Sequence, residues 1–275
     1  MKLTPLNEGL LLLRNGLTQA VDRLGERLRQ RQLEADVDPY VPSPAEVKLG
    51  LASRQWRLFK YLVTDIALWS DQRSAFLMRA IVDTRIVSAW LLAKNDLDLY
   101  ERFVAFGRGR LKLYKLHFED AAAADALEAD LTEYLDALEE AVNRDILEEF
   151  QEIDLGGNFA GVNTRQMAAE AGLKRLYDLL YQGLSSETHP QWNALLANDL
   201  VYSTDPLHQG HRFGRFDTGA EETRPEVVWH AFLLVAETLE SLFASLAVDV
   251  TRELEECRDA LVQAWQGGVA VARGD

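Results

Sequence analysis

Apolar residues recur at intervals of three and four along almost the whole chain, and this spacing most constrains the fold. The first such run places five apolar side chains on one face of a helix that ends near residue 32: Leu10, Leu13, Leu17, Val21 and Leu24. We find no alternation of apolar and polar residues, the mark of a half-buried strand, that outcompetes this pattern. The sequence therefore predicts an all-α protein.

Breaks in the pattern define the remaining helices. Only 7 prolines and 17 glycines interrupt 275 residues, and they gather between the apolar runs. Further helices are predicted over 43–69, 70–94, 97–118, 121–153, 164–171, 173–184, 191–200 and 225–265. Residues 202–223 are rich in Gly, His, Asp and Thr and are expected to be irregular. Because no long linker separates these elements, we predict one up-and-down helical bundle over residues 1–275. It has an N-terminal helix in 1–34 and a bundle core in 44–265.

The overall charge argues against a nucleic-acid or membrane protein. Lys and Arg number 29 against 44 Asp and Glu, a net charge of −15, which repels phosphate groups unless the fold gathers a basic patch. Cys257 is the single cysteine, so no intramolecular disulfide and no cysteine-based zinc site can form. No uncharged apolar run reaches the length of about 18 residues that a spanning helix needs. We expect a cytoplasmic protein that does not cross a membrane.

The acidic charge is concentrated in one segment. Residues 119–154 contain 14 acidic side chains and one base, Arg144, so this segment carries −13 of the −15. We interpret it as a solvated outer helix face. The alternative is a docking surface for a basic protein partner.

Arg79 is the first residue whose position is unexpected. It lies in the most apolar predicted helix, and Asp83 follows four residues later on the same face. An arginine in a bundle centre needs a partner, because an uncompensated buried charge costs several kcal/mol. The Arg79–Asp83 pair either orders the bundle or faces a ligand in an interior pocket.

Two further groups of polar residues are candidates for a site. Tyr177 and Tyr181 share a helical face, and Ser185 and His189 follow at the end of that helix. A polar loop carries the second group, which consists of His208, His211 and Arg212. Together with His189, Asp199 and Asp205, these histidines could ligate a metal, but no motif of fixed ligand spacing is present. We therefore expect no metal and no cofactor.

Three segments together resemble a bacterial family of all-helical proteins defined as a domain of unknown function. They are residues 77–83, 176–190 and 205–212, so the resemblance spans roughly 70–215. The family pattern is a helical Arg-x-x-x-Glu followed by Tyr-x-x-Leu-Ser-x-x-x-His, which the chain matches at Arg79 and from Tyr181 to His189. Asp83 stands where the family usually has Glu, and its shorter side chain changes what it can reach.

That family is similar to the HEPN helical bundles (higher-eukaryote and prokaryote nucleotide-binding), many of which are metal-independent ribonucleases in toxin–antitoxin or anti-phage systems. The resemblance implies a HEPN-like bundle with extra N-terminal helices, acting as a homodimer. HEPN ribonucleases carry Arg-x(4–6)-His at the start of a late helix, and Arg224 to His230 fits this pattern, as does Arg110 to His117. His230 would then move protons at the RNA 2′-OH and the 5′-leaving oxygen. Arg224 would stabilise the charge on phosphorus.

Three hypotheses of function follow from these residues. The first is a non-catalytic bundle that binds a partner protein or a small anionic ligand, with Arg79 and the His-rich loop as recognition groups. It suits the acidic surface and the weakness of the catalytic motifs. The second is a HEPN-like endoribonuclease that cleaves RNA with Arg224 and His230. The third is a helical metalloenzyme that uses the His-rich loop.

Overall fold

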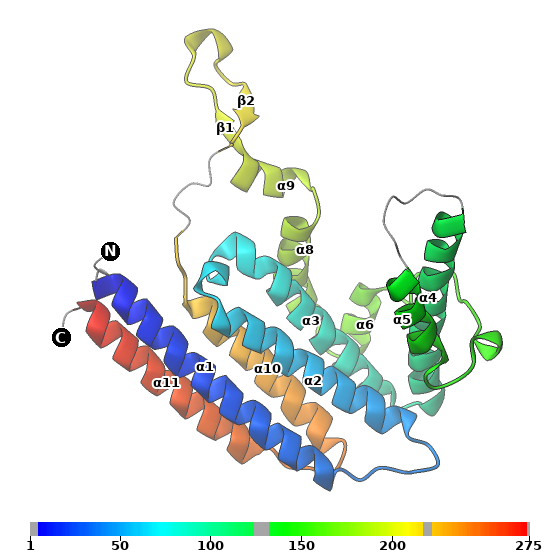
Figure 1. The fold of residues 1–275 in the computed structure, drawn as a ribbon. Helices are drawn as coiled ribbons and strands as arrows, with labels where there is room; N and C mark the ends of the chain where they lie inside the picture. The colour runs from blue at the N-terminus through cyan, green and yellow to red at the C-terminus, as the bar shows by residue number, and fades with distance from the viewer. Residues whose placement is uncertain (1–4, 124–131, 217–221, 274–275) are drawn as a thin grey trace.

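A computed structural model describes residues 5–123, 132–216 and 222–273 (Figure 1). The helices are α1 (Pro5–Arg31), α2 (Ser43–Thr64), α3 (Asp71–Lys94), α4 (Leu97–Ala123), α5 (Thr132–Asn143), α6 (Thr164–Glu170), α7 (Lys174–Leu176), α8 (Gln182–Thr188), α9 (Trp192–Ala194), α10 (Glu226–Ala244) and α11 (Thr251–Arg273). Two short strands, β1 (Leu200–Tyr202) and β2 (Arg212–Gly214), pair antiparallel. The all-α prediction is confirmed.

The core lies where α2, α3 and α10 pack against one another. Phe59, Ile81 and Val235 are fully buried there, one from each helix. Ser70 begins α3 by accepting a hydrogen bond from the backbone N–H of Arg73, and Asn95 ends it in the left-handed conformation (φ 45°). These caps fix the length of the helix that carries Arg79.

Helices α1 and α11 form a long antiparallel pair beside α2, so the start of α1 lies close to the end of α11 (Figure 1). The pair is close-packed because glycine lies at the crossing. A Cβ on Gly16 would stand 2.6 Å from the Cβ of Ala264, and one on Gly268 would stand 2.8 Å from the Cβ of Leu13. The two backbones therefore approach more closely than larger residues would allow.

The predicted single helix over 225–265 is wrong, because the chain turns between α10 and α11. Ala247 adopts a positive φ of 59°, and the Asp249 carboxylate caps α11 by accepting from the backbone N–H of Thr251 at 2.9 Å. Leu246, Val248 and Val250 are buried in the turn. The turn is thus apolar and contains neither glycine nor proline, which hides it in a hydrophobicity pattern.

The predicted helix over 121–153 is also wrong in its bounds. Helix α4 continues to Ala123, α5 ends at Asn143, and a short 3₁₀ turn follows at η3 (Glu148–Phe150). The Lys112 amine donates to the backbone carbonyls of Glu148 and Gln151 at 2.8 and 2.9 Å. The Gln151 amide donates to those of Val142 and Ile146. These side chains satisfy carbonyls that a continuous helix would have paired. Leu127 and Leu131, two apolar residues of this predicted helix, lie outside the described residues.

The region predicted to be irregular contains a β-hairpin. Strands β1 and β2 extend away from the bundle, and Tyr202 pairs with Arg212 across the hairpin (Figure 1). Helix α10 is the one described helix that is long and apolar enough to cross a membrane by length and composition. It packs against α2 and α3, as the core helix of a bundle does.

Candidate functional site

Arg79 of α3 lies at the centre of a cluster of polar and aromatic side chains. Its side chain is 14% exposed and forms an ion pair with Asp83, which is 42% exposed. The guanidinium carbon lies 3.3 Å from the centre of the Tyr181 ring, a cation–π contact on the face of the ring. The expected Arg79–Asp83 pair is therefore present. Tyr181, which belongs to the second motif predicted from the sequence, packs against the arginine of this pair.

The tyrosine is placed by an unusual helical turn. Residues 174–188 form a nearly continuous helical segment in which η4 (Tyr177–Tyr181) is a π-helical turn. Within this turn the rings of Tyr177 and Tyr181 stack with centres 4.5 Å apart and an interplanar angle of 21°. Both η4 and α8 pack against α3. Single π turns occur frequently at functional sites, where they redirect side chains.

The electrostatics of the cluster depend on partial burial. Burial raises the pKa of the Asp83 carboxyl, against the opposing charge of Arg79 and the hydroxyl of Tyr181. Burial likewise raises the pKa of Tyr181, whose hydroxyl lies within hydrogen-bonding reach of Thr164 on α6. We refer to Arg79, Asp83, Thr164, Tyr177 and Tyr181 as the Arg79 cluster.

Arg79 keeps a donor that its neighbours do not use. Its Nε atom is buried and has no hydrogen-bond partner among the described residues, whereas Nη1 is engaged by the ion pair with Asp83. A buried guanidinium N–H without an acceptor is costly, and native proteins usually supply one from the protein, from water or from a ligand. The cluster is thus organised but incomplete.

Helix α6 is held in place by Glu170, which the sequence did not single out. The Glu170 carboxylate accepts from the indole N–H of Trp90 at 2.7 Å and from the amide of Gln166 at 2.9 Å, and it pairs with Lys94 at 3.0 Å. These hydrogen bonds, led by the one from Trp90, lower the pKa of Glu170 to about 2. The charged carboxylate ties α6 to α3. This tie keeps Thr164 beside Tyr181.

Ser185 and His189 lie farther along the same segment. The carbonyl of Ser185 accepts from the backbone N–H of His189 at 3.1 Å and from the Thr188 hydroxyl at 3.0 Å, which ends α8. The His189 ring is exposed and makes no contact with the Arg79 cluster among the residues described. These two residues therefore act here as the end of a helix.

The His-rich loop forms the exposed hairpin. The rings of His208 and His211 lie 5.9 Å apart, and the guanidinium of Arg212 stands 4.4 Å from the ring centre of Tyr202. Within the described ranges, no three His, Cys, Asp or Glu side chains come together as metal ligands. The metalloenzyme hypothesis thus finds no ligand set in this part of the chain.

Arg224 and His230 lie at the start of α10 but have different neighbours. The Arg224 guanidinium pairs with Asp71 at 2.9 Å and with Glu222 at 3.0 Å. His230 is exposed and borders an apolar groove of about 320 Å³ whose walls include Trp229 and Trp265. No contact joins Arg224 to His230 in the described residues. The predicted catalytic pair therefore stays a prediction.

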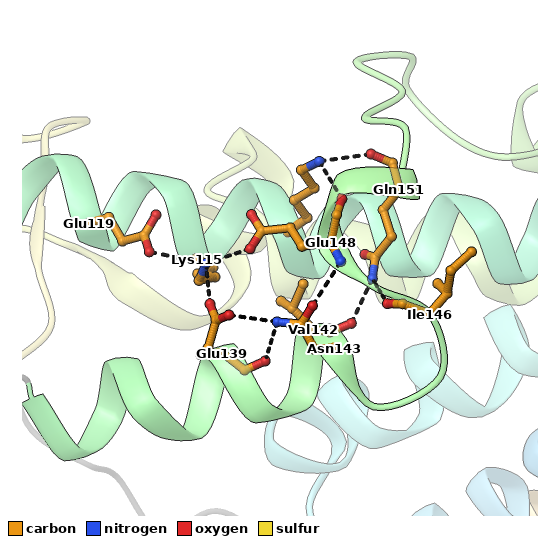
Figure 2. Close-up of polar contacts among 9 residues, drawn as sticks. Lys115, Glu119, Glu139, Val142, Asn143, Ile146, Glu148 and Gln151 are labelled. Atoms are coloured by element: carbon orange, nitrogen blue, oxygen red, sulfur yellow. Dashed lines mark hydrogen bonds and ion pairs between the residues drawn. The ribbon is translucent and has the colours of Figure 1, made fainter.

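The acidic segment holds a feature that the sequence reading missed. Lys115 of α4 is buried, 6% exposed, and its amine contacts the carboxylates of Glu119, Glu139 and Glu148 (Figure 2). Burial alone would lower the pKa of Lys115, but hydrogen bonds to the three carboxylates outweigh it and raise the pKa. The segment is therefore partly neutralised from inside, and not all of its acids face water. The spacing of Lys115 and Glu119, four residues apart in one helix, was the available signal.

Comparison with known proteins identifies the family of this chain. Residues 45–205 match a family described as a family of unknown function (DUF5677), and this span holds more than half of the 275 residues. The chain belongs to the DUF5677 family. The expected membership of a helical family of unknown function is confirmed. No curated protein and no solved structure matches it.

The DUF5677 span divides the candidate residues. It runs from the first turn of α2 to the loop after β1 and includes the whole Arg79 cluster, with Ser185 and His189. Arg224, His230 and the three residues of the His-rich loop lie beyond it. The Arg79 cluster is therefore the candidate site that belongs to the shared region of the family.

Proposed function

We propose that this protein is a helical binding module that takes a small anionic ligand at the Arg79 cluster. The observation that supports it is the unused hydrogen-bonding capacity of Arg79. A guanidinium fixed by a tyrosine ring on one face and by a carboxylate at one edge has little freedom left to lose on binding. Its buried Nε–H still needs an acceptor.

The chemistry of the cluster favours a carboxylate or phosphate group. Arginine presents its N–H donors in a planar fork that matches two oxygens of such a group. Asp83 already supplies one negative charge, so a bound anion competes with it. Because burial raises the pKa of Asp83, protonation of this carboxyl is easier than for an exposed aspartate and weakens that competition.

Calorimetric titration with inorganic phosphate, citrate and adenosine monophosphate tests this proposal. We expect at least one of these anions to bind the wild type and Arg79→Gln to bind it about tenfold more weakly or worse. A hydrogen bond to a charged group contributes about 1.5–3 kcal/mol, and 1.4 kcal/mol is a factor of ten.

Arg85 provides the matched control. It lies on the same helix, its side chain is 12% exposed, and it pairs with Glu237 of α10 at 3.2 Å. Arg85→Gln should leave anion binding unchanged, since it removes a similar buried ion pair away from the cluster. Equal losses in both variants, or no binding of any probe by the wild type, would make the Arg79 cluster purely structural.

We keep the HEPN-like ribonuclease, acting in a bacterial defence or toxin–antitoxin-type system, as a second proposal. The exposure of Arg224 and His230 at the start of α10 supports it, since both side chains can be reached by RNA. The two carboxylates on Arg224 weaken it, because RNA phosphate would have to displace them. Cleavage of total RNA in the presence of EDTA, lost in His230→Ala, is the expected result. Intact RNA with the wild-type protein would reject the ribonuclease proposal.

A further inference from the structure

The hairpin that leaves the bundle is an unusual surface for so acidic a protein. We refer to residues 199–216 as the arm; Figure 1 shows it extending from the end of α9. The arm carries Asp199 and Asp205 before Pro206, but from Pro206 to Phe216 it has no carboxylate and carries two histidines and two arginines. Its large apolar side chains are exposed: Tyr202, Leu207, Phe213 and Phe216. An isolated two-stranded hairpin is marginally stable in water, so such an arm is expected to pack against a partner.

The exposed groups of the arm are arranged in order. Tyr202 and Arg212 form a cross-strand pair in which the guanidinium stacks on the ring and donates to the hydroxyl. A Cβ on Gly214 would stand 3.1 Å from the Phe216 ring, which places that ring on the same face, next to Arg212. Arg212 has no carboxylate partner among the described residues. One face of the arm therefore presents two aromatic rings and an unpaired cation.

A surface of opposite character lies on α5. Glu133, Asp136 and Glu140 are exposed and spaced three and four residues apart, on the side of the helix away from the buried Leu138 and Val142. None of the three forms an ion pair in the described parts of the chain. We call these carboxylates the α5 acid stripe.

Two tyrosines lie elsewhere on this part of the molecule. Tyr134 of α5 contacts Tyr114 of α4, with the two hydroxyls 3.1 Å apart, and it lies nearer the buried side of α5 than the stripe. The α5 acid stripe and the three carboxylates that pair with Lys115 lie in the same acidic segment, but they share no residue. The stripe therefore offers negative charge, the complement of the cation on the arm.

We propose that the arm docks on the α5 acid stripe of a second copy of this chain, reciprocally, so that two copies form a closed dimer. Within one chain the arm and α5 lie on separate parts of the molecule (Figure 1). A reciprocal exchange satisfies both surfaces on both copies and closes around a twofold axis without forming a filament. The exposed Leu207 and the net charge of −15 favour this protein partner over single-stranded RNA. The proposal is independent of anion binding at the Arg79 cluster.

Charge reversal on each surface, followed by mixing, tests the proposal. The arm variant carries His211→Glu and Arg212→Glu, and the stripe variant carries Glu133→Lys, Asp136→Lys and Glu140→Lys. In sedimentation velocity the wild type should dimerise, more weakly at high salt. Each variant alone should dissociate with a Kd raised about tenfold or more, because like charges would then face each other in both contacts.

Mixing the two variants is the decisive measurement. The acidic arm of one then meets the basic stripe of the other, and the basic arm meets the acidic stripe, so both contacts of a heterodimer become attractive. We expect the mixture to dimerise although neither component does, which an unfolded variant could not achieve. A monomeric wild type, a dimer that both variants retain, or a mixture that stays monomeric would overturn the proposal. A monomeric wild type that binds oligouridylate through the arm would replace the second copy by RNA.

Discussion

Replacing Lys115 by methionine should lower the free energy of unfolding by about 2–3 kcal/mol and loosen α5 more than the rest of the bundle. The substitution keeps the buried carbon chain but removes the amine on which three carboxylates converge. Glu148 is the least exposed of them, with a side chain 21% exposed, and loses most. Breaking a fully buried ion pair lowers the free energy of unfolding by more than this. Here solvent reaches the carboxylates of Glu119 and Glu139, which limits the loss of stability.

Chemical denaturation and amide exchange measure this prediction. Exchange in α5 should accelerate strongly in Lys115→Met, while exchange in α10 should change little. Lys174→Met is the control, because Lys174 pairs with Asp178 four residues away and its side chain is 55% exposed. It should cost less than about 0.5 kcal/mol. Equal effects of the two substitutions would show that the three carboxylates do not depend on Lys115.

The pH dependence of this effect has a definite sign. The folded protein raises the pKa of Lys115 above its ordinary value of 10.5. A group whose pKa is raised by folding stabilises the fold fully below its unfolded pKa, and loses that contribution only as the pH climbs through the folded value. The deficit of Lys115→Met should therefore be the same at pH 7 and pH 9.

Alanine at Gly16 should destabilise the protein by about 1–3 kcal/mol, even though alanine is the better helix former. The added methyl would stand 2.6 Å from the Cβ of Ala264 and 3.4 Å from its Cα, so α1 and α11 must separate to admit it. Thermal and chemical denaturation of Gly16→Ala would measure the cost.

Gly50→Ala is a control for which we expect the opposite change in stability. Gly50 lies in α2, and a Cβ built on it meets nothing within 4 Å. Gly50→Ala should stabilise by about 0.5–1 kcal/mol, since alanine reduces the freedom of the unfolded chain without a clash. If both substitutions stabilise, the crossing of α1 and α11 is looser than the structure indicates.

Hydrophobic periodicity was sufficient to predict the helices whose caps are local. Ser70 and Asn95 mark the bounds of α3 in the sequence itself, and the first helix ended within a residue of its expected place. The turn after α10 could not be predicted in this way. Its residues Leu246, Val248 and Val250 are buried in the folded protein, so the turn is as apolar as the helices that flank it.

The site could be predicted only in part for a similar reason. Arg79 and Asp83 are four residues apart and meet within one helix, which spacing alone reveals. Tyr181 reaches Arg79 because a π turn shifts the helical register, and no local propensity encodes that shift. Glu170 and Lys115 owe their roles to partners 80 and 33 residues away, Trp90 and Glu148. Such contacts exist only once the tertiary fold does.

The pairing of α1 with α11 has a consequence for synthesis of the protein. The apolar face of α1 packs on α11. Leu13 and Leu17 therefore stay exposed in the growing chain until more than 200 further residues have left the ribosome. Domains with many contacts between distant parts of the chain fold slowly, and they expose apolar surface until folding is complete. We expect nascent chains truncated before α11 to be held by chaperones. The bundle would then complete its folding only after α11 has left the ribosome.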